Sequence, residues 1–358
     1  MSKFHTLKVI DVREETDDCK SIAFEVPAEL HEEFQYKMGQ HLTIRAMIEG
    51  EDVRRNYSLC SSPLDNEWRV AVKKLPGGKF STYANQVLKK GHLLDVMPPA
   101  GHFYTELKAD NKKNYVAFAA GSGITPMLSI MKTVLRTEPE STFTLVYGNR
   151  NTLSIIFHEE IEGIKNKFME RLRVYYILSR ERLEEAIFNG RINEEKCSEL
   201  FDGLLDVKNA DEFFICGPEE MILAVEKSLK TAGVADEKIH FELFTSPGTN
   251  QGNDKKVYSV EDEGKVSAVT VTSDGKTFSF NLPFGQANLL DAAMREGADL
   301  PYACKGGVCC TCKARVLEGE VEMERNYGLV KEEIEAGFIL TCQAFPKTEK
   351  VVIDFDDI

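Results

Sequence analysis

The chain has 358 residues, of which 42% are hydrophobic and 28% are charged, and its formal net charge at pH 7 is -14. This length allows two or three domains with packed cores. An acidic balance without a block of Lys and Arg argues against nucleic acid or an anionic membrane as the partner. The sequence shows no apolar leader and no run of eighteen apolar residues, so we expect a cytoplasmic protein that does not span a membrane.

The first region, residues 1–108, alternates apolar and polar residues in short runs separated by turn residues. Examples are HLTIRAMI from His41 and WRVAVKKL from Trp68. Short alternating strands with frequent turns are typical of antiparallel sheets. We therefore predict an antiparallel β-barrel with few helices.

Strand and helix patterns alternate in the second region, residues 109–245. The runs NYVAFAAG from Asn114 and TFTLVYGN from Thr142 read as buried strands, and TPMLSIMKTVLRT from Thr125 reads as a helix. This alternation predicts an open parallel α/β sheet. A polar stretch rich in Gly, Asn and Pro follows, and we predict a linker over residues 246–256.

A third domain is predicted over residues 257–358. The run VSAVTVTSDGKTFSFNL from Val266 contains two alternating segments around Asp274 and Gly275, which is a strong signal for a β-hairpin. The helix pattern NLLDAAMREG begins at Asn288. The chain as a whole is therefore predicted to be a multidomain protein whose last domain is α+β.

The segment CKGGVCCTC places four thiols within nine residues. Cys304, Cys309 and Cys312 have the spacing C-x4-C-x2-C, and Cys342 follows after a long gap, which is the ligand pattern of plant-type 2Fe-2S clusters. Two irons bridged by sulfides need soft thiolate ligands, and a Gly-rich loop lets backbone amides approach the cluster sulfurs. We predict that Cys304, Cys309, Cys312 and Cys342 are the cluster ligands.

Two other kinds of cysteine site fit this segment less well. A structural zinc site usually has two separated C-x2-C knuckles, whereas only Cys309 and Cys312 have that spacing here. A thioredoxin-like redox pair would lie between a strand and a helix of a βαβ unit, and this pair does not. Cys310 belongs to neither pattern and is expected to be a small apolar filler.

From residue 257 the chain resembles a plant-type ferredoxin, which implies a β-grasp fold for the third domain. The first 245 residues resemble the ferredoxin-NADP reductase superfamily through RNYSL, which matches its R-x-Y-S signature. The resemblance implies that Tyr57 stacks on the flavin, Arg55 neutralises its phosphate, and Ser58 lies near flavin N5 as a catalytic residue. Without the resemblance, the same residues would read as an exposed strand.

A second resemblance to this superfamily is PGGKFSTYA, which lies where the superfamily holds the flavin phosphate. Gly77, Gly78 and Ser81 open a predicted helix whose free amides can hold a pyrophosphate. A plain turn with a helix cap would look the same in sequence. Val72 and Lys73 on the preceding predicted strand are expected to line the flavin.

The segment AAGSGITPM resembles the G-x-G-x-T-P loop of the superfamily. It follows a predicted strand and opens a helix, but it lacks the third glycine of the dinucleotide fingerprint. The resemblance implies that Gly121, Gly123, Thr125 and Pro126 hold the nucleotide phosphates and the nicotinamide. A tight strand-to-helix turn is the alternative.

The segment ICGPEEM matches the C-G-P motif of the superfamily with Cys216, Gly217 and Pro218. By resemblance, Cys216 is a catalytic residue near nicotinamide C4, although an isolated cysteine more often packs in a core. The segment FELF lies where the superfamily returns the chain to the flavin, which makes Glu242 and Phe244 further candidates.

Three residues after predicted strands favour NADPH as the nucleotide. Arg150 ends YGNR, and Ser179 and Arg180 stand in LSRE, which resembles the phosphate-binding Ser and Arg of NADPH-using members. A 2'-phosphate needs cationic and hydroxyl donors where NADH-specific folds place an acid. The alternative is that both arginines merely face solvent at strand ends, and NADH remains possible.

The domain order resembles the single-chain reductases of multicomponent oxygenases, most closely those of the phenylacetyl-CoA epoxidase type. This resemblance implies FAD, a 2Fe-2S cluster and NADPH as cofactors, with a hydride passing to the flavin and single electrons crossing the cluster. The implied partner is a soluble oxygenase or another electron-accepting protein. FMN in place of FAD, a general diaphorase that serves a hydroxylase or cytochrome, and a non-catalytic redox sensor remain open.

Overall fold

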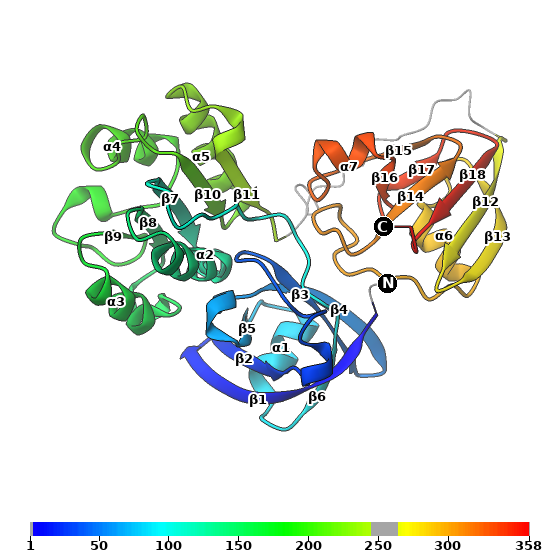
Figure 1. Cartoon of the computed structure of the whole chain (residues 1–358), viewed down its shortest axis with the longest axis horizontal. Coiled ribbons are helices and arrows are strands. Elements are labelled where there is room, and N and C mark those ends of the chain that lie inside the picture. Colours follow the sequence, from blue (N-terminus) through cyan, green and yellow to red (C-terminus); the bar gives the residue numbers. More distant parts are fainter. Residues whose placement is uncertain (1–2, 245–263, 358) are drawn as a thin grey trace.

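The computed structural model describes residues 3–244 and 264–357. The predicted linker, residues 246–256, and the predicted start of the third domain at residue 257 lie outside the described residues. Three lobes follow one another along the chain, each built on its own sheet (Figure 1). None of the helices in the described part of the chain is both long enough and apolar enough to cross a lipid bilayer.

The first lobe is the predicted antiparallel barrel. Its six strands have the order β4-β3-β6-β1-β2-β5, and a bridge between Leu59 and Val70 links the end of β4 to β5 and closes the sheet. The hairpin between β3 and β4 turns through Glu49 and Gly50, which both have positive φ, as a two-residue hairpin turn requires. The elements are β1 (His5–Thr16), β2 (Cys19–Glu25), β3 (His41–Ile48), β4 (Glu51–Ser58), β5 (Trp68–Lys73), β6 (Leu93–Val96), α1 (Lys79–Gln86), and the 3-10 turns η1 (Ala28–Leu30) and η2 (Pro63–Asp65).

The second lobe is the predicted parallel α/β sheet, with the strand order β11-β10-β7-β8-β9. Alternate residues of β7 enter two different hydrophobic cores, Tyr115 on one face and Val116 on the other, so helices cover both faces. The strands are β7 (Asn114–Ala120), β8 (Thr142–Asn149), β9 (Leu172–Leu178), β10 (Glu212–Cys216) and β11 (Ile239–Glu242). The helices are α2 (Ile124–Thr137), α3 (His158–Lys167), α4 (Glu194–Gly203) and α5 (Glu219–Thr231), with the 3-10 turns η3 (Gly121–Gly123), η4 (Thr152–Ser154), η5 (Ala186–Phe188) and η6 (Asp236–Lys238).

The third lobe is the α+β unit, a mixed sheet with the order β13-β12-β18-β14-β16 and a small second sheet of β15 and β17. The hairpin predicted at Asp274 and Gly275 is present, and both turn residues have positive φ. The elements are β12 (Val266–Ser273), β13 (Lys276–Pro283), α6 (Leu289–Arg295), β14 (Lys313–Glu318), β15 (Val321–Met323), α7 (Lys331–Glu335), β16 (Phe338–Leu340), β17 (Ala344–Pro346) and β18 (Lys350–Asp354).

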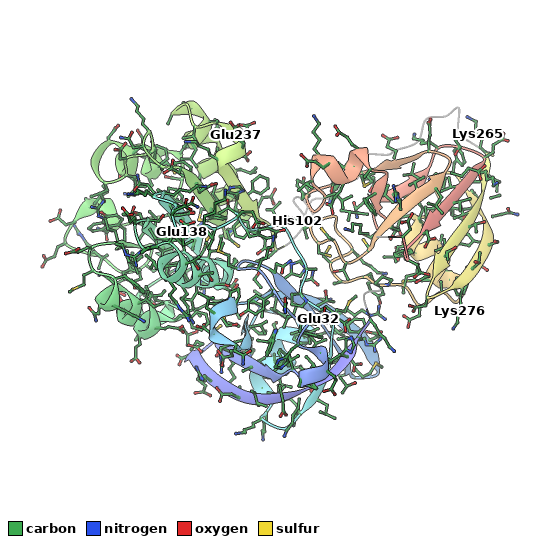
Figure 2. All side chains as sticks on the ribbon, in the orientation of Figure 1. Glu32, His102, Glu138, Glu237, Lys265 and Lys276 are labelled. Carbon is green, nitrogen blue, oxygen red and sulfur yellow. The ribbon has the colours of Figure 1, made fainter. Side chains whose placement is uncertain are left out.

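A buried arginine, Arg54, makes several of the contacts between the barrel and the third lobe. Arg54 on β4 is only 5% exposed, and its guanidinium donates a 3.0 Å hydrogen bond to the Leu300 carbonyl. It also lies 4.3 Å from the ring centroid of Tyr302 and pairs with Asp52 at 2.8 Å. A second contact pairs His102 with Glu333 at 3.3 Å, and His102 lies where the lobes approach one another (Figure 2). These contacts place Leu300, Tyr302 and the helix α7 against the first lobe.

Candidate functional site

A cavity of about 520 Å³ lies between the three lobes, and we call it the shared cavity. The barrel, the start of α2, the end of β11 and the cysteine loop all contribute to its wall. The residues predicted from the sequence that line it are Arg55, Tyr57, Ser58, Lys73, Gly78, Ser81, Thr125, Glu242, Phe244, Cys304 and Cys309. Residues far apart in the chain, chosen as flavin, nucleotide and cluster residues, therefore meet at one place.

The barrel wall of the shared cavity carries an aromatic pair and a structured turn. The ring of Tyr57 lies 5.3 Å from that of Phe80, measured between centroids. Ser81 Oγ accepts from the Leu75 amide at 3.1 Å and donates to the Gly78 carbonyl at 3.2 Å, which fixes the turn before α1. The helix begins at Lys79 with Gly78 as its N-cap, so the first-turn amides of α1 are directed at the cavity edge. This wall suits an aromatic ring system with an attached phosphate.

Ser58, Glu242 and His41 form a polar group at the junction of the first two lobes. Ser58 donates a 2.9 Å hydrogen bond to Glu242, and His41 Nδ1 lies 3.9 Å from the other carboxylate oxygen. Burial raises the pKa of Glu242 to about 7, although the Ser58 hydrogen bond opposes the shift. Burial also lowers the pKa of His41 to about 4, so this imidazole is neutral near pH 7. The cavity thus holds a carboxyl group that can carry a proton near neutral pH.

Two predicted flavin residues do not reach the shared cavity. The side chain of Val72 is fully buried in the barrel core, because alternate residues of β5 face opposite sides of the sheet. Gly77 has a φ of 73° and shapes the turn, while its neighbour Gly78 lines the cavity.

The two predicted nicotinamide loops lie against each other at the carboxyl ends of β7 and β10. A Cβ on Gly123 would stand 2.0 Å from the Cys216 carbonyl oxygen, and one on Gly217 would stand 2.7 Å from Met221. Gly123 therefore requires glycine for close backbone packing, whereas a side chain at Gly217 would displace the end of the Met221 side chain and press on Ala120 at 3.2 Å. Of this group only Thr125 lines the shared cavity, where its hydroxyl donates to the Ser122 carbonyl at 3.0 Å. Gly121, Pro126 and Pro218 do not line the shared cavity and belong to the turns that hold these loops.

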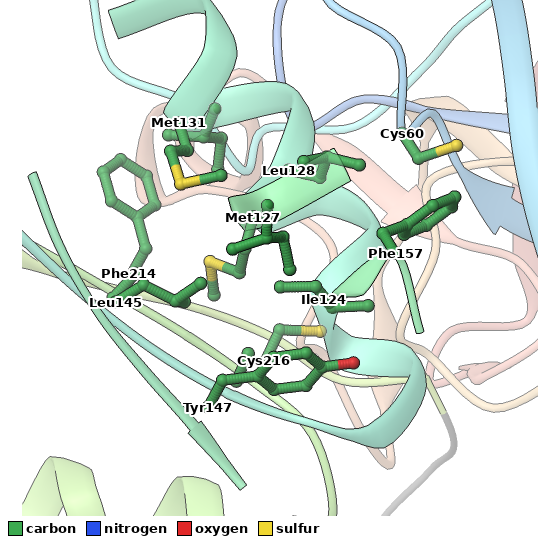
Figure 3. Close-up of a cluster of buried hydrophobic side chains, with 14 of the residues drawn as sticks. Cys60, Ile124, Met127, Leu128, Met131, Leu145, Tyr147, Phe157, Phe214 and Cys216 are labelled. Carbon is green, nitrogen blue, oxygen red and sulfur yellow. The ribbon is translucent and has the colours of Figure 1, made fainter. Parts of the chain in front are cut away.

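Cys216 lies in the hydrophobic core and does not line the shared cavity. Its side chain is fully buried near Ile124 and Tyr147 (Figure 3), and burial raises the pKa of its thiol. A thiol in this environment is not a nucleophile at neutral pH. If Cys216 lies beside the nicotinamide as predicted, its role would be that of a small side chain that leaves room for the ring.

Ser179 and Arg180 line a second, separate cavity of about 460 Å³ at the end of β9, together with Arg182. The Arg180 amide donates to the Arg150 carbonyl at 2.7 Å, so the predicted phosphate-binding arginines are neighbours across two strand ends. Glu181 in the same wall is engaged by Thr152, which donates to it through its amide at 2.7 Å and through its hydroxyl at 2.8 Å.

The four predicted ligand cysteines come together in one connected group of sulfurs. The Cys309 thiol lies 3.1 Å from the Cys304 sulfur, and Cys312 and Cys342 are also in hydrogen-bond contact. Hydrogen bonds from Cys309 and Cys342 and from the Gly306 amide hold the pKa of Cys304 well below its usual range. The Gly306 amide stands 3.3 Å from the Cys304 sulfur, as expected for a loop that donates to cluster sulfurs.

This group of four sulfurs fits a cluster of two irons that takes four cysteine thiolates. No three His, Cys, Asp or Glu side chains within residues 3–244 and 264–357 converge on a point suited to a single metal ion. Cys310 is turned away from the four sulfurs, since its thiol donates to the Gly328 carbonyl at 2.8 Å. Cys310 is partly buried and packs at the edge of the third core, which agrees with its expected role as a filler.

Several residues of the site escaped the sequence analysis, among them His41, Asn56, Arg54 and Tyr302. A register argument could have found His41. Counting outward from the turn at Glu49 and Gly50 pairs His41 with Ser58, so both side chains lie on one face of the hairpin. The contacts of Arg54 with the third lobe have no comparable signal in the sequence.

Comparisons with known proteins agree with this arrangement. Three families match in succession: an oxidoreductase FAD-binding domain over residues 6–104, an oxidoreductase NAD-binding domain over 118–227, and a 2Fe-2S iron-sulfur cluster binding domain over 271–347. One component of the 1,2-phenylacetyl-CoA epoxidase from Escherichia coli K12 is 47% identical, and the match covers 99% of each chain. The ferredoxin reductase component of 3-ketosteroid-9-alpha-monooxygenase from Rhodococcus rhodochrous is 37% identical over 98% of this chain and 96% of its own.

Among solved structures, phthalate dioxygenase reductase has the same fold, with a TM-score of 0.59, 22% identity and 98% coverage of both chains. The multidomain fold and the predicted cofactors, FAD, a 2Fe-2S cluster and a nicotinamide nucleotide, are thus confirmed at the level of the domains. The chain belongs to the family of oxygenase reductase components, oxidoreductases that pass electrons from NAD(P)H through a flavin and a 2Fe-2S cluster to an oxygenase.

Proposed function

We propose that this reductase takes electrons from NADPH and delivers them to an oxygenase of the phenylacetyl-CoA epoxidase type. The shared cavity is the observation that carries the electron path, because flavin, nucleotide and cluster candidates line one space. The near full-length identity of 47% to an epoxidase component favours that class of acceptor. Electron transfer through a cluster also suits a compartment that keeps thiols reduced, so we infer a cytoplasmic location.

The barrel residues are proposed to hold FAD. When bound, FAD accepts a hydride and releases electrons singly. Tyr57 would stack on its ring, and Arg55, with the first-turn amides after Gly78, would bind its phosphates. Ser58 and Glu242 would hold a proton at the ring edge, since the raised pKa of Glu242 keeps this carboxyl partly protonated near pH 7.

The second lobe is proposed to hold NADPH across the ends of its strands. Gly123 and Gly217 let the two loops close together, and Thr125 would contact the nicotinamide half from the cavity side. Ser179 and Arg180, with Arg150 beside them, would bind the 2'-phosphate. Glu181 in the same wall accepts one hydrogen bond from Thr152 on each of its carboxylate oxygens.

A reconstitution assay tests the proposed acceptor. The purified reductase, NADPH and the oxygenase components of a phenylacetyl-CoA epoxidase should together oxidise phenylacetyl-CoA. The 3-ketosteroid-9-alpha-monooxygenase oxygenase serves as the comparison acceptor. Equal turnover of both oxygenases would indicate a general reductase. If neither oxygenase turned over while ferricyanide was reduced rapidly, the protein would be a diaphorase that serves another acceptor.

A further inference from the structure

A chain of polar side chains leads from the barrel wall to the cysteine loop. His41 Nε2 lies 3.1 Å from the side-chain amide nitrogen of Asn56, and the side-chain oxygen of Asn56, Oδ1, accepts from the Thr43 hydroxyl at 3.0 Å. The Thr43 hydroxyl in turn lies 3.2 Å from that of Thr311 on the third lobe. Both threonines are buried, at 3% and 8% exposure, so water cannot readily replace either partner.

His41 sets the direction of each hydrogen bond in this series of side chains. The Asn56 amide nitrogen can only donate, so His41 Nε2 accepts and the ring proton is on Nδ1, the nitrogen that faces Glu242. Thr43 gives its one hydroxyl proton to Asn56. The bond between the two threonines therefore requires the proton of Thr311.

Thr311 has a second acceptor for that proton. The Thr311 side chain also acts on the Cys309 sulfur, because its hydrogen bonding opposes the rise in the pKa of this thiol that Cys304 and burial cause. Hydrogen bonds to the sulfurs of an iron-sulfur cluster stabilise its reduced, more negative form and so raise its reduction potential. One proton thus has two possible partners, a barrel hydroxyl and a ligand sulfur.

We propose that Thr43 is a positioning residue that keeps the Thr311 hydroxyl proton away from the Cys309 sulfur while the third lobe is docked on the barrel. With a cluster bound at these cysteines, an added electron would make the Cys309 sulfur the better acceptor, and the Thr311 proton would rotate toward it without leaving Thr311. The contact between Thr43 and Thr311 would lower the reduction potential of the cluster. Thermodynamic linkage then requires that reduction of the cluster weakens this contact by the same free energy. Electron arrival would therefore loosen the docked lobe and favour its transfer to the oxygenase. The inference rests on the proposed role of Cys309 as a cluster ligand.

A double-mutant cycle on the full chain tests this inference. The reduction potential of the cluster is measured by redox titration in the parent, Thr43→Val, Thr311→Val and the double variant, with the reduced cluster followed by its EPR signal. Thr43→Val should free the Thr311 proton for Cys309 and make cluster reduction about tenfold more favourable, a positive shift of about 59 mV for one electron. Thr311→Val and the double variant should both stay near the parent.

The double variant separates this effect from simple loss of docking. If Thr43→Val acted only by exposing the cluster to water, the double variant would show the same positive shift, and the inference would be overturned. An unchanged or lower potential in Thr43→Val would also overturn it. Thr6→Val, at an exposed barrel hydroxyl that donates to Asp95, is the matched control and should leave the potential unchanged.

Hydrogen exchange gives a second readout that does not depend on turnover. Amides around Thr43 and Thr311 should exchange faster after reduction of the cluster in the parent, and this difference should shrink in Thr43→Val. Iron content is measured on every variant. A parent without two irons per chain would refute the proposed electron path, whereas two irons with no difference among variants would refute only the coupling.

Discussion

The hydroxyl of Ser58 donates a 2.9 Å hydrogen bond to the carboxylate of Glu242, although the two residues are 184 positions apart in the chain. Ser58 ends β4 of the barrel and Glu242 ends β11 of the parallel sheet, so their contact joins the first two lobes at the shared cavity. Because the Glu242 pKa is raised to about 7, this contact brings an exchangeable proton to the proposed flavin edge.

The raised pKa of Glu242 predicts a pH-dependent effect on stability. Its pKa in the folded chain lies above the ordinary value of 4.5, so its contribution to folding is fully present below about pH 4.5 and is lost as the pH rises through about 7. Glu242→Gln removes this loss. The melting temperature of this variant relative to the parent should therefore increase from about pH 5 to about pH 8.

Glu220→Gln, at an exposed carboxylate on α5, provides the control for that series. The difference in melting temperature between Glu220→Gln and the parent should be the same at pH 5 and at pH 8. If the difference in melting temperature between Glu242→Gln and the parent also stayed the same from pH 5 to pH 8, the Glu242 carboxyl would have an ordinary pKa.

The grouping of the four sulfurs predicts a sharp contrast between the nearby thiols of Cys310 and Cys312. The parent and Cys310→Ala should both hold about two irons per chain, because the Cys310 thiol is bonded to the Gly328 carbonyl and away from the four sulfurs. Cys312→Ser should lose the visible absorbance of the cluster. Iron analysis and absorption spectra measure this, and loss of iron in Cys310→Ala would contradict the ligand assignment.

The cavity at the end of β9 predicts how the reductase selects its nucleotide. Arg180→Ala should raise the KM for NADPH and spare NADH, because a charged hydrogen bond to the 2'-phosphate contributes about 1.5 to 3 kcal/mol. Steady-state rates with both nucleotides measure the change. Arg173→Ala, an exposed arginine on the same strand, is the control. If the unmodified protein uses both nucleotides with equal kcat/KM, the assignment of Ser179 and Arg180 fails.

The contacts of Arg54 predict that this residue holds the third lobe in place for electron transfer. Arg54→Met keeps the apolar stem but leaves the Leu300 carbonyl without its donor, which should weaken docking by about 1 to 3 kcal/mol. In stopped-flow experiments with NADPH, cluster reduction should slow more than flavin reduction. Arg13→Met is the control, since Arg13 pairs with Asp11 on β1 of the barrel. Equal slowing of both steps would show that Arg54 acts on the flavin and not on docking.

Local patterns in the sequence were sufficient for the fold class and for the presence of a 2Fe-2S domain. Two-residue turns such as Asp274–Gly275 specify hairpins through positive φ, and the spacing of Cys304, Cys309 and Cys312 reflects one short loop. The boundaries at residues 108, 245 and 257 and the roles of the individual site residues remain predictions.

The tertiary structure alone decided which of those residues meet. Val72 and Lys73 are adjacent in sequence, yet only Lys73 faces the shared cavity, because the two side chains leave opposite faces of β5. The contacts of Ser58 with Glu242 and of Thr43 with Thr311 join segments from different lobes. Sequence periodicity reports the burial of each segment within its own sheet, whereas such contacts depend on how the finished sheets pack together.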